Sequence, residues 1–190
     1  MHFKKMTCLP KYIQGVRVLG GVEANIMDYN GSLDMPVYIL EKLDWVIASM
    51  HESHLPSTTT QNHSQAWIEI AKNPHVDLIG HCGDDRFRFD YEKVIKVFKE
   101  YNKILEVNNH SFIAREGSKK NCVELSKLCM KYEVPILLTS DAHFCLSVGD
   151  VSESIEMLEE INFPNKLILN TDYDVLISEI KRLRGRDFSL

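Results

Sequence analysis

The chain has 190 residues, of which 44% are hydrophobic and 26% charged, and its formal net charge is −5. Such a length and composition indicate one globular domain, 1–190, with a substantial core, and exclude two domains of ordinary size. The acidic balance argues against a nucleic-acid partner, and no apolar run reaches the length needed to cross a membrane.

The cysteines and the first residues bear on the compartment. Five cysteines, an odd number with no Cys-x-x-Cys pair, indicate free or buried thiols in a reducing environment. The first ten residues lack the apolar core of a secretory signal. We therefore expect a cytoplasmic protein. A phosphorylated substrate remains compatible with the negative charge, because a bound metal adds positive charge that the formal count omits.

Short apolar runs recur along the chain and predict the strands. They cover residues 16–23, 45–51, 76–81, 104–109, 134–143 and a short 166–170. Runs of this kind, separated by stretches with helical spacing, are typical of a parallel sheet.

Apolar residues between these runs follow a helical period. The expected helices cover about 33–43, a segment around 66–71, 90–101, 119–132, 151–161, and a last helix that opens with a capping box at 171–174. Six strands alternating with six helices predict an α/β fold with a parallel sheet. A closed (β/α)₈ barrel needs about 250 residues, so this chain should fall short of one.

Most of the longer runs end in a side chain that can bind a metal. Those side chains are Glu23, His51, His81, Asp141 and His143. The carboxyl ends of parallel strands meet at one edge of the sheet, where ligands bind. Imidazole nitrogen and carboxylate oxygen are ligands of zinc, and manganese and iron accept them too. The sequence therefore predicts a transition-metal site suited to metal-assisted hydrolysis of an ester or amide.

The remaining polar residues fit structural roles. Surface positions are expected for His54, His63, His75 and His110. Structural hydrogen bonding is expected for Asp44, Asp77 and Glu106, and loop capping for Asp84 and Asp85. Two interpretations stay open for Arg115, which either binds a substrate phosphate as a bidentate fork or is an ordinary exposed arginine.

Six short strings resemble one known family. They lie at 21–26 (GVEANI), 48–51 (ASMH), 79–83 (IGHCG), 105–109 (LEVNN), 117–122 (GSKKNC) and 140–143 (SDAH). Together, and in this order over essentially the whole chain, they resemble the PHP (polymerase and histidinol phosphatase) superfamily, and within it the small YcdX-type phosphatases. The resemblance implies a distorted (β/α)₇ barrel with a trinuclear metal site, usually zinc, that hydrolyses phosphomonoesters.

The resemblance also implies roles for the candidate residues. Glu23 would be a bridging carboxylate that completes one metal site with His51 and His81. Asp141 would serve a second metal beside Glu23, and His143 a third. Gly83, Asn108 and Asn109 would shape the substrate pocket, so that Asn108 and Arg115 are the expected substrate-binding residues.

The sequence lacks the first histidine motifs of the family pattern, and this changes the number of metal sites that we expect. Members open with a His-x-His strand, a further His and a Thr-Asp-His strand, none of which occurs here. Residues 1–3 resemble the stretch that follows two such βα units, so we expect an N-terminally incomplete barrel with one well-formed metal site. The thiol of Cys82, where the family often has proline, is expected to pack in the core.

Three functions follow from these observations. The first is a metal-dependent phosphatase that acts on a small phosphomonoester. The second is a catalytically impaired remnant that binds a metal or a partner chain, with self-association through an uncovered strand at the barrel edge. The third is metal-dependent hydrolysis of a substrate without phosphate, because the fold alone does not fix the substrate. The group that protonates the leaving alcohol stays unassigned.

Overall fold

A five-stranded parallel sheet forms the centre of the molecule, in the order β3-β4-β5-β6-β7. A computed structural model describes residues 5, 6 and 8–185; the resemblance noted for residues 1–3 lies outside them. The strands are β3 (Gly21–Asn25), β4 (Trp45–Ser49), β5 (Leu78–Ile79), β6 (Ile104–Asn108) and β7 (Ile136–Thr139). The α/β class with a parallel sheet is confirmed. Within the described residues β3 and β7 are the two outermost strands of the sheet, and a closed barrel is not shown.

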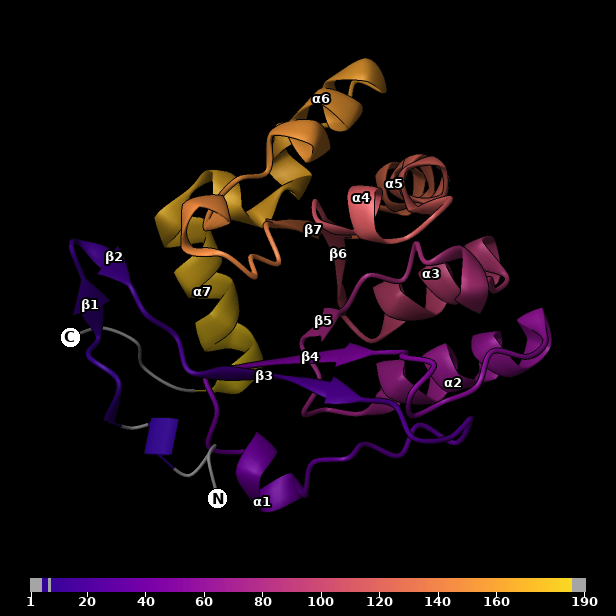
Figure 1. The fold of residues 1–190 in the computed structure, drawn as a ribbon, viewed down its shortest axis with the longest axis horizontal. Helices are drawn as coiled ribbons and strands as arrows, with labels where there is room; N and C mark the ends of the chain where they lie inside the picture. The colour runs from indigo at the N-terminus through magenta and orange to yellow at the C-terminus, as the bar shows by residue number, and fades with distance from the viewer. Residues whose placement is uncertain (1–4, 7, 186–190) are drawn as a thin grey trace.

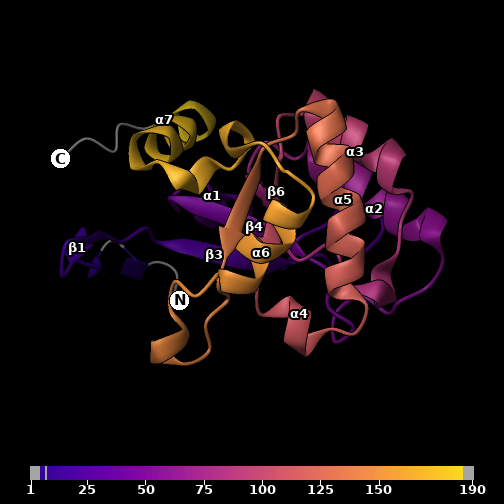
Figure 2. The same ribbon diagram turned by 90° about the horizontal axis from the view of Figure 1, so that it is seen from above.

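Helices α1 to α5 connect the successive strands, and α6 and α7 follow the last strand. They are α1 (Val37–Leu40), α2 (Thr60–Lys72), α3 (Tyr91–Glu100), α4 (Ser111–Ala114), α5 (Ser118–Tyr132), α6 (Ser152–Glu160) and α7 (Tyr173–Arg184). Figure 1 shows α2, α3 and α5 stacked in chain order beside the strands that they connect, and Figure 2 shows α7 apart from that stack. A small antiparallel hairpin, β1 (Tyr12–Ile13) with β2 (Val16–Arg17), precedes the sheet. None of the helices in the described part of the chain is long and apolar enough for a membrane span.

The first and last predicted helices differ from the observed ones at their starts. A helix was expected over about 33–43, but α1 is a single turn that begins after Pro36. Leu33 cannot join it, because a bridge to Ile26 holds Leu33 in extended backbone. The last helix is capped by Asp172, whose carboxylate accepts from the Val175 amide. Thr171 is therefore not the cap; its hydroxyl donates to the Ile168 carbonyl.

The short strand predicted at 166–170 is wrong. The segment forms two 3₁₀ turns, η4 (Asn165–Leu167) and η5 (Leu169–Thr171), and only Ile168 bridges to β7, at Ile136. The side chain of Asn170 replaces the missing strand, because its amide accepts from the Leu138 N–H at 3.1 Å and donates to the Leu138 carbonyl at 2.8 Å. The backbone N–H and C=O of Leu138 on β7 are thus hydrogen-bonded to a side chain instead of to the backbone of a neighbouring strand.

The two faces of the sheet have different partners. Side chains alternate along a strand, so Val46 and Ile79 face the larger core, which the interstrand helices cover. Ile47 and Leu78 face the opposite way, into a smaller cluster that includes Leu183 of α7. Helix α7 therefore covers part of the second face. The polar residues described next lie on that same face, farther toward the carboxyl ends of the strands.

Candidate metal centre

Polar side chains gather on the second face of the sheet, at the carboxyl-terminal half of the strands. Because they alternate with residues of the larger core, they point away from the stacked helices. They are Glu23, Asn25, Ser49, Glu106, Asn108 and Thr139. His51 and His81 each lie two residues after the last residue of a strand, β4 and β5 respectively. The parallel topology thus delivers acidic and imidazole groups to one edge, as the sequence predicted.

Glu23, His51 and His81 bring three ligand atoms together. Glu23 Oε1 lies 2.9 Å from His81 Nε2 and 3.6 Å from His51 Nε2, and the two Nε2 atoms are 3.0 Å apart. Tetrahedral zinc with bonds of about 2.0–2.1 Å separates neighbouring ligand atoms by about 3.4 Å. The observed separations bracket that value, and the donor set of one carboxylate and two imidazoles suits the metal. This triad is hereafter called the metal cluster.

Asn25 fixes the orientation of His51. The Nδ1 atom of His51 donates to Asn25 Oδ1 at 2.8 Å, which leaves the Nε2 lone pair directed at the metal cluster. Asn25 is held in turn by Asp34, whose carboxylate accepts from the backbone N–H of Asn25 at 2.9 Å and from its side-chain amide. Such outer contacts set the tautomer and ring position of a metal-binding histidine.

The backbone at His81 is held in an unusual conformation. Its φ angle is 26°, in the left-handed region that β-strand ends rarely enter. Its N–H donates to the buried carboxylate of Glu106 at 2.5 Å, and the other Glu106 oxygen accepts from the Thr139 hydroxyl at 2.8 Å. Burial raises the pKa of Glu106, an effect that the nearby His81 opposes. The structural role predicted for Glu106 is confirmed, and it supports a residue of the metal cluster.

The ionisation states of Glu23 and His51 favour the binding of a cation at the metal cluster. Burial alone would raise the pKa of Glu23, but the hydrogen bond from His81 and the nearby imidazoles outweigh it and lower this pKa to about 2. The pKa of His51 is lowered, first by burial and then by His81. Glu23 is therefore a carboxylate and His51 a neutral imidazole near neutral pH, and these are the forms that bind metals.

Asp141 and His143 lie apart from the metal cluster. Among the described residues, the cluster is the one group of three potential ligands whose atoms lie within 4.8 Å of one another. Asp141, with a left-handed φ of 46°, accepts from Asn108 Nδ2 at 3.2 Å. His143 is 72% exposed in its side chain, and its ring lies 5.1 Å from that of His110.

Arg115 lies between Asp141 and Asp84. Its guanidinium donates to Ser111 Oγ at 2.7 Å, and lies 3.5 Å from the Asp84 carboxylate and 4.0 Å from that of Asp141. Only 14% of its side chain is exposed, so it is not the ordinary surface arginine considered above. Asn108 uses both ends of its amide, because its Oδ1 also accepts from the Ser111 N–H.

Of two further predictions from the sequence, the one for His63 is wrong and the one for Cys82 is confirmed. A surface role was expected for His63, yet this side chain is 1% exposed. It is buried because Thr58 N–H donates to its Nε2 and its Nδ1 donates to the Arg88 carbonyl, so both ring nitrogens are satisfied. Cys82 is buried in the larger core, as expected.

Asn25 was missed from the sequence, although it lies two residues after Glu23 on the same face of β3. We expect Asn25→Ala to weaken zinc binding by about 10–100-fold, because His51 loses the partner that fixes its tautomer. Isothermal titration calorimetry with zinc measures the change. Asn30→Ala, in an exposed turn, is the control; equal affinity in both variants would contradict the orienting role.

Comparisons with known proteins agree with hydrolytic chemistry. No family model matches the chain. A protein of Acetivibrio thermocellus named probable phosphatase is 43% identical over 185 residues, which span 97% of this chain and 77% of that protein. Probable phosphatases of Caldicellulosiruptor bescii and Caldicellulosiruptor saccharolyticus are each 42% identical, over 100% and 98% of this chain and 79% and 78% of their own lengths.

Proposed function

This chain belongs to the phosphatase family that those relatives represent, and we propose that it hydrolyses a small phosphomonoester at the metal cluster. The observation that carries the proposal is the convergence of Glu23 Oε1 with the Nε2 atoms of His51 and His81. We assign the chain to the YcdX-type phosphatases of the PHP superfamily on the six sequence strings, with the distorted (β/α)₇ barrel of that group as its architecture. A cytoplasmic location is part of the same proposal.

Glu23, His51 and His81 would hold the metal, with zinc the first choice and manganese or iron as alternatives. A divalent ion bound there polarises a phosphoryl oxygen and lowers the pKa of a bound water toward neutrality. The protein's own contribution is to keep each ligand in the ionisation state that binds a metal. The low pKa of Glu23 keeps its carboxylate ionised, and the lowered pKa of His51 keeps its Nε2 free of a proton.

Arg115 would bind the phosphate of the substrate. Its guanidinium is largely buried and held by Ser111, so that its remaining N–H groups are fixed in direction before a substrate arrives. Asn108 would act through Asp141, because its side-chain amide donates to that carboxylate. Asp141 and His143 would contribute to the second and third metal sites, which we expect to be weaker because neither residue joins the metal cluster.

The alternative proposal is a catalytically impaired remnant, which differs from the phosphatase in that it does not turn over a substrate. In that case the chain binds one metal, or a partner through an outer strand of the sheet, without hydrolysis. Self-association is part of this proposal, and β3 is the better edge for it because Ile168 and Asn170 cover part of β7. Sedimentation velocity distinguishes a monomer from an edge-paired oligomer.

A phosphatase assay separates the hypotheses. The purified chain, supplied with zinc, manganese or iron, should release phosphate from p-nitrophenyl phosphate, and chelation with EDTA should abolish the release because the metal is removed. Readdition of metal should restore it. Metal binding without release from any of a panel of small phosphomonoesters would overturn the phosphatase proposal and leave the remnant.

A further inference from the structure

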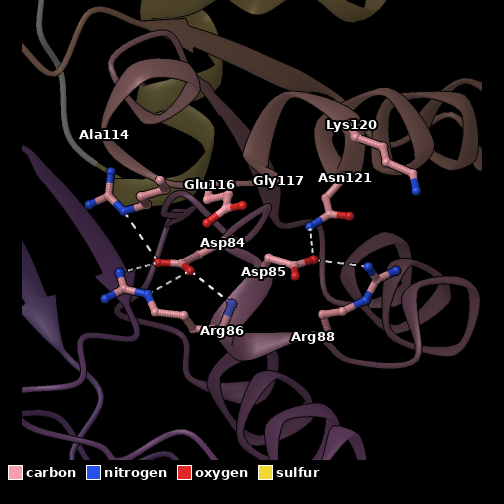
Figure 3. Close-up of a pocket in the computed structure, with 10 residues that line it drawn as sticks. Asp84, Asp85, Arg86, Arg88, Ala114, Glu116, Gly117, Lys120 and Asn121 are labelled. Carbon is pink, nitrogen blue, oxygen red and sulfur yellow. Dashed lines mark hydrogen bonds and ion pairs between the residues drawn. The ribbon is translucent and has the colours of Figure 1, made fainter.

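A charged pocket of about 620 Å³ lies beside the metal cluster. Four cationic and three anionic side chains line it, together with Asn121, and only Ala114 and Gly117 bring no polar side chain (Figure 3). Because seven of the ten lining residues carry a charge, charged and hydrogen-bonding groups should decide which ligand the pocket recognises. Its occupant should therefore be polar or charged.

Arg115 joins this pocket to the metal cluster. It lines the pocket, lies 4.0 Å from Asp141, and has only 14% of its side chain exposed. Arg86 makes a second connection, because its guanidinium pairs at 2.8 Å with Glu52, the residue that follows His51. A phosphomonoester bound through Arg115 would therefore direct its alcohol part into the pocket.

The pocket's aspartates are already neutralised. Asp84 accepts from Arg86 Nε at 3.0 Å and Nη2 at 2.6 Å, and Asp85 accepts from Arg88 at 3.0 Å and from Asn121 at 2.9 Å. Arg86 is fully engaged, because its third nitrogen pairs with Glu52, whereas Arg88 uses only Nη1 and keeps the rest of its fork available. The carboxylates thus position the cations and do not block an anion.

Lys120 is the cation without a carboxylate partner among the pocket residues, all of which the structure describes. Figure 3 shows Lys120 and Arg88 reaching toward the same end of the pocket, next to Asn121, whereas Glu116 lies nearer to Asp84. One unpaired ammonium and one guanidinium with free N–H groups form a suitable contact for an anionic group. Asn121 does not take part, because its side-chain NH₂ donates to the Gly83 carbonyl and to Asp85.

We propose that this end of the charged pocket binds a second anionic group on the alcohol part of the substrate, at Lys120 and Arg88. The inference rests on the proposed phosphatase function and names its substrate class: small phosphomonoesters that carry a further phosphate or carboxylate. Arg115 holds the phosphate that is cleaved, and the far end of the pocket selects the partner group.

Calorimetry with non-hydrolysable ligands tests this assignment. The probes are hexylphosphonate, 6-phosphonohexanoate and hexane-1,6-bisphosphonate, titrated into the zinc-supplied full chain. The two probes that carry a second anionic group should bind about tenfold or more tightly than hexylphosphonate, because a charge-assisted contact of this kind changes affinity by about that factor. The carboxylate and phosphonate arms show which anion is preferred.

Lys120→Ala should remove this preference, with hexylphosphonate affinity unchanged. Lys119→Ala is the matched control, because Lys119 is adjacent in sequence, pairs with Glu153 and does not line the pocket. Equal binding of the three probes to the wild type, or an unchanged preference in Lys120→Ala, would overturn the proposal even if phosphatase activity is found. A preference that Lys120→Ala removes, in a chain without phosphatase activity, would support the anion site and reject the proposed function alone.

Discussion

Replacing His81 with alanine should lower both zinc affinity and phosphatase activity by about a hundredfold or more. His81 Nε2 lies within 3.0 Å of both other ligand atoms of the metal cluster, so its loss leaves two ligands where a catalytic zinc site has three. The side chain is 2% exposed. Glu23→Gln should have a comparable effect, because an amide carries no charge to bind the ion.

His54→Ala is the matched control for this prediction. His54 lies in the same loop as His51, but its ring Nδ1 hydrogen-bonds with the Ser53 hydroxyl at 2.8 Å and it does not join the metal cluster. Zinc titration and p-nitrophenyl phosphate hydrolysis should be unchanged in this variant. Activity in His81→Ala equal to that of the control would show that hydrolysis takes place without the metal cluster.

Arg184→Ala should lower the free energy of unfolding by about 3–5 kcal/mol, because it leaves a buried carboxylate without its partner. Arg184, in the last turn of α7, pairs with Asp77, which directly precedes β5, and also donates to the carbonyls of His75 and Leu40. The Asp77 side chain is 2% exposed, and burial raises its pKa despite the opposing charge of Arg184. In the wild type these contacts therefore hold α7 against the amino-terminal ends of the strands.

Urea unfolding measures this effect, and Arg182→Ala is the control. Arg182 lies on the same helix and pairs with Glu179 three residues away, but its side chain is 51% exposed. Its removal should cost less than about 1 kcal/mol. Equal losses in the two variants would mean that the buried pair contributes no more than a surface pair.

The sequence was a good guide wherever local pattern decides structure. The apolar runs predicted β3 to β7, although the first run, 16–23, was wrong at its start because Val16–Arg17 form the hairpin strand β2 and β3 begins at Gly21. The rule that parallel strands present their carboxyl ends at one edge brought Glu23, His51 and His81 together. The roles of these residues as ligands remain a proposal. Asp77 also met its expected structural role, since its carboxylate accepts from the Val46 N–H.

The remaining features depend on contacts between distant segments. Arg184 and Asp77 are 107 positions apart, and nothing local to either marks the pair. The strand predicted at 166–170 failed because a single side chain, that of Asn170, satisfies the β7 backbone instead. The burial of His63 depends on the Arg88 carbonyl, which lies in a different loop. The pattern of neighbouring residues in the sequence does not indicate which distant segments contact each other.

The most direct test of the central claim is an anomalous diffraction map from crystals of the chain grown with zinc. We predict a zinc peak about 2.0–2.2 Å from Glu23 Oε1 and from the Nε2 atoms of His51 and His81. A map at saturating zinc that shows no peak among these three atoms, or places the ion on other residues, would contradict the account.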